Sequence, residues 1–375
     1  MERLHISAVG DISNGPEPLE ASFADVMETL RSADVRFGHA ERAYSARGRW
    51  VEQSGPTAPR RLPETAAGFK SVPFDVLSIA SNHTGDWGPE AVEDTVETFR
   101  ALGIPTVGSG RNIEEARKPV IITRKGIRIA FLGYVSVIPV QTWATETRAG
   151  CAPMRAHTYY EPYEYQPGAL PRVVTVPFAA DLENLLCDVR NAKNNADLVF
   201  VSLHWGLHFQ PRPCDYQRIV AHAAIDAGAT AILGHHPHQP QGVERYKDGV
   251  IFYSIGNFSF GLSRKGSSHC LPHGLYTHQQ VYSIEPDPGF VFDYRRHWNE
   301  GGIAFFEVDL KGIHRVTYVP TLMNEIGQPR LLKPPHPQFA KSLEYLNWAG
   351  RFMPGGLTQM KAVGDRYEVH VRDSA

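Results

Sequence analysis

The stretch from Asp197 to His238 constrains the fold of this chain more than any other part of the sequence. Its two apolar runs, Leu198–Leu203 and Ala229–Leu233, have the length of buried parallel strands. The segment Cys214–Asp226 between them has the length of a crossover helix. Both runs end in loops that leave the carboxyl edge of the same sheet, where open α/β sheets bind their ligands. The sequence therefore predicts an α/β fold with its site at this edge.

Histidines occupy both of these loops. His204 follows the first apolar run, and His236 and His238 flank a proline after the second. One histidine after a strand is most often a hydrogen-bonded loop residue. Three in one strand–helix–strand unit, two of them on a stiff turn, favour a transition-metal or mixed metal site. We interpret His208 and His235 as bystanders.

Polar residues also follow three predicted strands earlier in the chain: Asp11 after Leu4–Val9, Glu41 after Asp34–Phe37, and Asn82 with His83 after Val76–Ala80. Asn82 offers a neutral oxygen ligand to a metal. His83 suits acid–base catalysis near neutral pH, and Asp86 is placed to orient it. The alternative for Asp11 is an ordinary helix N-cap or turn aspartate.

Composition limits the classes of partner. The formal net charge of −2 gives no reason to expect nucleic acid or a membrane surface as a partner. No run reaches the roughly 18 apolar residues of a membrane span, and the N-terminus has no apolar segment typical of a signal peptide. The four cysteines show no metal-binding or redox spacing and are typical of reduced thiols. We expect a cytoplasmic protein.

The body of the protein is predicted to span residues 1–327, with a C-terminal extension over 328–375 packed on it. Two long segments are predicted as excursions over the site, at about 141–177 and 263–300. The first is rich in aromatic residues and proline, and the second carries His297. Segments of this length are rarely idle connections. We interpret the first as a lid or wall facing the substrate, with a packed surface loop as the alternative, and the second as another excursion over the site.

Six short motifs together resemble the poly-γ-glutamate capsule-synthesis (CapA-like) family of the calcineurin-like metallophosphoesterase superfamily: Gly10-Asp11, Glu41, Ser81-Asn82-His83, Ser202-Leu203-His204-Trp205-Gly206, Gly234-His235-His236-Pro237-His238 and Tyr253-Ser254-Ile255-Gly256-Asn257-Phe258. The resemblance implies a four-layer α-β-β-α sandwich. It also implies one or two divalent ions (Ca²⁺, Mn²⁺ or Mg²⁺) with His83 as the catalytic histidine. The implied metal ligands are Asp11, Glu41, Asn82, His204, His236 and His238.

The sequence departs from the superfamily pattern at two positions. Ser13 stands where the Asp-x-His pattern needs a histidine, and Glu41 stands where an aspartate bridges the metals. With the expected lack of a membrane anchor, the chain is similar to the lasso-peptide epimerases within this family. That resemblance implies a metal-dependent isomerase that inverts a Cα centre, with the C-terminal residue of a precursor peptide as substrate.

Inversion of a Cα centre needs one group to remove a proton and another to return it on the opposite face. His83 with Asp86 is one candidate pair, and Asp11 with His297 is the other. The alternatives are a metallophosphoesterase or related hydrolase of the same family, and a non-enzymatic binding protein in polymer or capsule assembly.

Overall fold

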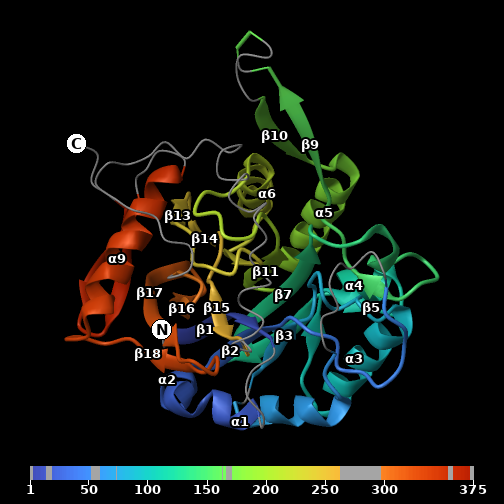
Figure 1. The fold of residues 1–375 in the computed structure, drawn as a ribbon, viewed down its shortest axis with the longest axis horizontal. Helices are drawn as coiled ribbons and strands as arrows, with labels where there is room; N and C mark the ends of the chain where they lie inside the picture. Colours follow the sequence, from blue (N-terminus) through green and yellow to red (C-terminus); the bar gives the residue numbers. More distant parts are fainter. Residues whose placement is uncertain are drawn as a thin grey trace.

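The computed structural model describes residues 3–13, 19–51, 60–72, 74–162, 164–165, 171–261, 297–353 and 358–371. Two β-sheets pack face to face and helices cover their outer faces (Figure 1). The four-layer α-β-β-α sandwich implied by the sequence resemblance is therefore confirmed.

The larger sheet has ten strands and contains strands from both the N-terminal and the C-terminal parts of the chain. Its central strands are parallel, and the strands from the C-terminal part pair with β1 and with one another in antiparallel fashion. Across the sheet the order is β19 (Thr358–Val363), β20 (Arg366–Val371), β17 (Gly312–Met323), β16 (Glu300–Asp309), β1 (Leu4–Ile12), β2 (Val35–Ala40), β3 (Val76–Ser78) and β4 (Thr106–Val107), with β15 (Asn257–Ser259) on β1 and β18 (Pro329–Leu331) on β17.

The smaller sheet has six strands and contains the strand–helix–strand unit. Its order is β13 (Val243–Tyr246), β14 (Gly249–Phe252), β12 (Ala231–His235), β11 (Leu198–His204), β7 (Ile127–Val135) and β6 (Val120–Arg124). Strands β11 and β12 are parallel and every residue in them is buried. Burial on both faces explains their continuous apolar runs. The predicted crossover helix is α6 (Asp215–Asp226).

Aromatic side chains from the two sheets interlock between them. Phe37 of β2 stacks on Phe131 of β7, with 5.3 Å between ring centroids. Phe200 of β11 meets Phe306 of β16 edge to face, also at 5.3 Å. Helix α9 (Pro337–Ala349) adds Tyr345 and other apolar side chains to the same core. These contacts fix the two sheets relative to each other, so residues at their carboxyl ends can form one site.

Helices cover the two outer faces. On the larger sheet lie α1 (Leu19–Ser22), η1 (Ala24–Val26), α2 (Met27–Arg31), η3 (Pro63–Lys70) and α3 (Pro89–Ala101). On the smaller sheet lie α4 (Ile113–Arg117), α5 (Ala179–Asn195) and α6. In this set, η1 is a 3₁₀ turn that runs directly into the short α-helix α2. Short 3₁₀ turns η4 (Val140–Thr142) and η5 (Gly350–Phe352) complete the set.

The first predicted excursion, 141–177, contains a two-stranded ribbon. Strands β9 (Ala156–Glu161) and β10 (Arg172–Pro177) pair with each other and project from the body of the molecule (Figure 1). Tyr159 and Tyr160 of β9 are 52% and 69% exposed, so they line neither the core nor a closed wall. The base of this excursion holds β8 (Gly150–Cys151), which pairs with β5 (Ser109–Gly110). Most of the second predicted excursion, residues 263–296, lies outside the described residues.

The predicted C-terminal extension, 328–375, continues the larger sheet. Strand β18 pairs with β17, β20 extends the same sheet beyond β17, and α9 packs into the core between the sheets. The domain boundary at residue 327 stays a prediction.

Candidate metal centre

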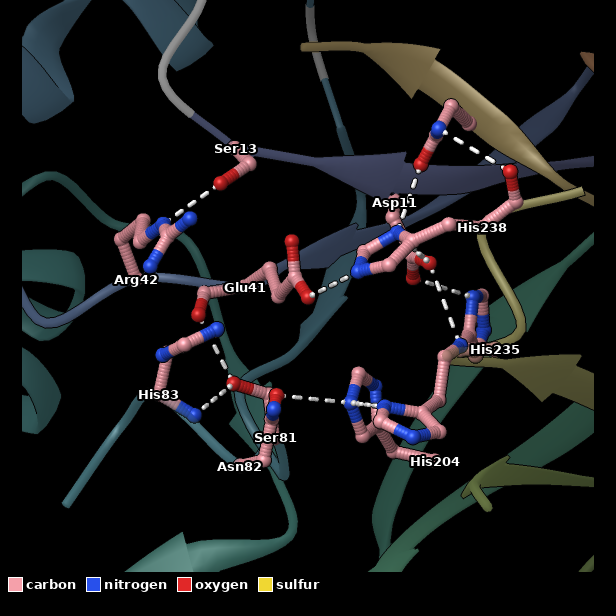
Figure 2. Close-up of polar contacts among 12 residues, drawn as sticks. Asp11, Ser13, Glu41, Arg42, Ser81, Asn82, His83, His204, His235 and His238 are labelled. Atoms are coloured by element: carbon pink, nitrogen blue, oxygen red, sulfur yellow. Dashed lines mark hydrogen bonds and ion pairs between the residues drawn. The ribbon is translucent and has the colours of Figure 1, made fainter. Parts of the chain in front are cut away.

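Most of the predicted ligands meet at the carboxyl edge shared by the two sheets (Figure 2). Asp11 lies near the end of β1, and Glu41 and Asn82 follow β2 and β3 of the larger sheet. His204 ends β11, and His238 lies three residues after β12 of the smaller sheet. The facing sheets therefore bring together side chains that are as far as 227 positions apart in sequence.

Asp11, Glu41 and His238 form one group of potential ligands. Their ligand atoms lie within 4.8 Å of one another, and all three residues are buried. The Nε2 atom of His238 is 3.5 Å from a Glu41 carboxylate oxygen, and its Nδ1 atom is 3.5 Å from an Asp11 oxygen. Within the described part of the chain, neither Glu41 oxygen and only one Asp11 oxygen has a hydrogen-bond partner. Unsatisfied buried carboxylate oxygens are costly, and a cation between them would satisfy both.

A second group shares Asp11 and contains His39 and His204, again with ligand atoms within 4.8 Å. The Nε2 atom of His204 faces the side-chain oxygen of Asn82 at 3.0 Å and the Nδ1 atom of His236 at 3.1 Å. Its Nδ1 atom lies 3.0 Å from Nε2 of His39. Imidazole and amide groups therefore converge beside the carboxylates.

The turn that presents His236 and His238 has an unusual backbone. The φ angles of these residues are 94° and 55°, in the left-handed region that residues with a Cβ seldom adopt. The backbone N–H of His236 donates to Asp11 at 3.1 Å, which helps to hold the turn. Such conformations persist where surrounding contacts impose them, and they cluster at functional sites.

Electrostatics keeps the ligands in their metal-binding forms. Burial, followed by the charges of neighbouring histidines, lowers the pKa of His204 and of His236 well below the usual range, so both rings are neutral. For Asp11, burial acts to raise the pKa, but contact with His235 and the charges of His39 and His238 outweigh it and leave a pKa of about 2. Metals bind neutral imidazole and ionised carboxylate. The donor set, two carboxylates with an amide oxygen and imidazoles, fits a divalent ion.

His83 and Asp86 form a pair at the edge of this centre. The Nδ1 atom of His83 is 2.7 Å from an Asp86 oxygen, the Asp86 side chain is buried, and the His83 side chain is 20% exposed. Ser81 fixes the turn, because its hydroxyl accepts from the backbone N–H of His83 and donates to the carbonyl of Glu41. Burial, and next the charge of Arg42, lower the pKa of His83 to about 3. Because Nδ1 of the neutral ring faces the Asp86 carboxylate, Nε2 is the nitrogen open to a proton.

Asn257 of the Tyr253–Phe258 motif sets the hydrogen bonding of His238. The side-chain nitrogen of Asn257 donates to the carbonyls of Trp298, at 3.0 Å, and of His238, at 3.3 Å. Because carbonyls only accept, the Asn257 oxygen must face Nδ1 of His238, which lies 2.8 Å away. His238 therefore carries its proton on Nδ1, and Nε2 is left with a free lone pair toward Glu41.

His235, interpreted from sequence as a bystander, lies 3.3 Å from an Asp11 oxygen. His208, also interpreted as a bystander, stacks against His236 with ring centroids 4.0 Å apart. His297 lies 3.4 Å from Glu300 and stacks on Tyr345 at 3.5 Å. Its pairing with Asp11 stays a prediction.

His39 is the residue that sequence reasoning missed. The sequence placed the end of this strand at Phe37 and assigned Glu41 as the ligand after it, whereas β2 continues to Ala40 and holds His39 in register with Asp11. The available signal was the alternation of β2, in which Val35 and Phe37 face the core between the sheets and His39 is the next residue in that row.

Comparison with known proteins identifies the family. Residues 5–262 match the bacterial capsule synthesis protein PGA_cap. The chain belongs to the PGA_cap family. The capsule biosynthesis protein CapA of Bacillus anthracis is 30% identical over 293 residues, which cover 73% of this chain and 64% of that protein. The PGA biosynthesis protein CapA of Bacillus subtilis (strain 168) is 28% identical over 339 residues, covering 88% and 77%. This PGA_cap member thus spans less than two thirds of the B. anthracis relative.

Solved structures resemble this PGA_cap protein more distantly. A putative 5'-nucleotidase from Staphylococcus aureus aligns with 91% of this chain and 58% of its own, at 12% identity and a TM-score of 0.44. Among the described residues, none of the helices combines the length and apolar character needed to cross a bilayer.

Proposed function

We propose that this PGA_cap protein is a metal-dependent peptide epimerase that inverts a Cα centre, with the C-terminal residue of a peptide as its substrate. The observation that carries the proposal is that two residues at the centre, Ser13 and Glu41, depart from the histidine and the bridging aspartate of the superfamily pattern. Ser13 stands where a metal-binding histidine is expected, and its hydroxyl accepts from the guanidinium of Arg42 at 2.5 Å. Arg42 thus places a fixed positive charge where a second metal would otherwise have a histidine ligand. We take this to favour removal of a proton next to the substrate's carboxylate over hydrolysis by two equivalent metal ions.

The residues that would hold the ion are Asp11, Glu41 and His238 in one group, and His204, Asn82 and His236 next to it. When bound, a divalent ion would offset negative charge on the carbonyl oxygen next to the reacting carbon. Its identity, among Ca²⁺, Mn²⁺ and Mg²⁺, and the number of ions, one or two, are part of the proposal.

Proton transfer falls to the chain's own residues. His83 is neutral and reaches the exposed side of the centre, so it can accept the Cα proton. Asp86, 2.7 Å from Nδ1, fixes the tautomer in which Nε2 is the base and supports the imidazolium that forms. The proton returned on the opposite face is assigned to Asp11 with His297. His297 precedes Trp298, whose ring lies 4.9 Å from that of His238.

Solvent isotope exchange tests this proposal. The metal-loaded protein is incubated in D₂O with peptides that end in each of the aromatic and aliphatic residues. We expect deuterium at a single Cα position together with inverted chirality, and loss of both in His83→Ala. If none of these peptides acquires deuterium or changes chirality, the epimerase proposal is wrong.

Hydrolysis is the second candidate, and family membership favours it. A hydrolase needs proton transfer on one side only, and the His83–Asp86 pair would supply it. The matching assay is release of p-nitrophenol from bis(p-nitrophenyl) phosphate by the metal-loaded protein. Turnover that is abolished in His83→Ala, without any Cα exchange, would favour the hydrolase over the epimerase.

A further inference from the structure

Arg42 is a buried cation beside the candidate metal centre. Its residue surface is 6% exposed, and it directly follows the potential ligand Glu41. Its Nε atom donates to the hydroxyl of Ser13, and its Cζ atom lies 5.8 Å from the centroid of the Phe260 ring. Figure 2 shows the guanidinium on the side of the centre that also carries Ser13 and His83.

The guanidinium is not neutralised by the part of the chain that the structure describes. No ion pair joins Arg42 to a carboxylate there, and its buried Nη1 atom has no hydrogen-bond partner. A buried charge that lacks a counter-ion is strongly unfavourable. The neutral hydroxyl of Ser13 supplies one hydrogen bond but no negative charge, so the arrangement calls for an anion that the described residues do not supply.

We infer that Arg42 binds an oxyanion of the substrate next to the metal centre, with Ser13 holding the guanidinium in position. A guanidinium presents a planar fork that pairs with two oxygens of a carboxylate or phosphate. Because Ser13 occupies Nε, the Nη1 side remains for the anion. The choice of carboxylate rests on the proposed epimerase function, in which this group is the free C-terminus of the peptide. A phosphate would supply the same chemistry under the hydrolase alternative.

Anion binding tests the inference independently of turnover. The probes are N-acetylphenylalanine, its uncharged amide and phenyl phosphate. Each is titrated by calorimetry into the Mn²⁺-loaded protein and into the EDTA-treated protein, so that binding to the metal and binding to Arg42 are separated. We expect N-acetylphenylalanine to bind in both states, the amide to bind at least tenfold more weakly, and Arg42→Gln to weaken the carboxylate at least tenfold.

Two further variants complete the design. Arg128→Gln, which removes an exposed arginine paired with Asp197, is the control for general loss of positive charge and should bind the probes as the natural protein does. Arg42→Lys keeps the charge but not the planar fork, and should bind N-acetylphenylalanine several-fold more weakly than the natural protein. This variant provides the test if Arg42→Gln does not fold. Natural affinity in both Arg42 variants would overturn the inference. If the Arg42 variants lose affinity for phenyl phosphate but not for N-acetylphenylalanine, Arg42 is still an oxyanion site. The carboxylate as its ligand, and with it the epimerase proposal, would then be overturned.

Discussion

Replacing Asn257 with leucine should weaken metal binding although Asn257 is not itself a ligand. Asn257 holds the Nδ1 proton of His238 at 2.8 Å and is itself fixed by two carbonyls at 3.0 and 3.3 Å. Leucine has nearly the same volume and offers no acceptor. Without that acceptor, each ring nitrogen of His238 has only a carboxylate oxygen at 3.5 Å, from Asp11 at Nδ1 and from Glu41 at Nε2, so the preference for a proton on Nδ1 is lost and the Nε2-protonated form becomes populated. The nitrogen that should bind the ion would then carry a hydrogen.

The expected magnitude follows from outer-shell partners of metal-binding histidines, whose removal costs about 10–100-fold in metal affinity. That range corresponds to about 1.4–2.7 kcal/mol of binding free energy. The assay is calorimetric titration of Mn²⁺ into the EDTA-treated protein. It is accompanied by ¹⁵N spectra of the imidazole nitrogens, which distinguish Nδ1-protonated from Nε2-protonated His238.

Ser254→Ala is the matched control. Ser254 lies on the same turn, and its hydroxyl accepts from the backbone N–H of Gly256 at 3.2 Å. Its loss should lower stability without changing the His238 tautomer. If folded Asn257→Leu protein binds Mn²⁺ as tightly as the natural protein and His238 keeps its proton on Nδ1, the reasoning about Asn257 is refuted.

Four further predictions concern the centre and the core. Glu41→Gln removes a buried charge, so it should raise the melting temperature of the metal-free protein while lowering Mn²⁺ affinity at least about tenfold; a lower melting temperature with unchanged affinity would contradict this. His83→Ala should lower turnover about 10²–10⁴-fold with Mn²⁺ affinity unchanged in calorimetry, and Asp86→Asn should act in the same direction; full activity in either variant would exclude the proton-transfer role. Phe131→Ala should cost about 3–5 kcal/mol of unfolding free energy in urea titrations, because its ring packs between the sheets; a loss below about 1 kcal/mol would not fit that packing. The metal-free protein should lose stability as the pH falls below 6.5, because the histidines bind protons in the unfolded chain but stay neutral when buried in the folded one. Each such histidine contributes up to about 1.4 kcal/mol of unfolding free energy per pH unit. Urea titrations between pH 7.5 and 5 check this, and an unfolding free energy that does not change with pH would count against it. The histidines concerned are His39, His83, His204, His208 and His236.

Much of the fold was predictable because burial leaves a clear pattern in sequence. The predicted strand Leu198–Leu203 and helix Cys214–Asp226 match β11 and α6 to within one residue at each end. The α-β-β-α architecture came from the family resemblance, since the pairing of two sheets does not follow from strand lengths. The ribbon β9–β10 was not predicted, because its exposed side chains on β9 leave no alternation between buried and exposed positions.

The centre was predictable where a polar residue comes directly after the apolar part of a strand, as Asp11 and His204 do, whereas His39 was passed over because its strand was predicted to end at Phe37. Along β12 and β2 the side chains that face the other sheet are apolar up to the carboxyl end, where the rows finish in His235 and His39; in β11 the corresponding row is Leu198, Phe200, Ser202 and His204. The ring of His39 stacks on His235 at 4.2 Å and on His204 at 5.0 Å. These three rings form a layer between the apolar core and the carboxylates. A histidine in the inward-facing row of a strand is a polar group at a core position, which needs a partner. Here the partners are Asp11 and the neighbouring rings, so in an α-β-β-α sandwich the last inward-facing residue of each central strand should be searched for ligands together with the loop that follows it.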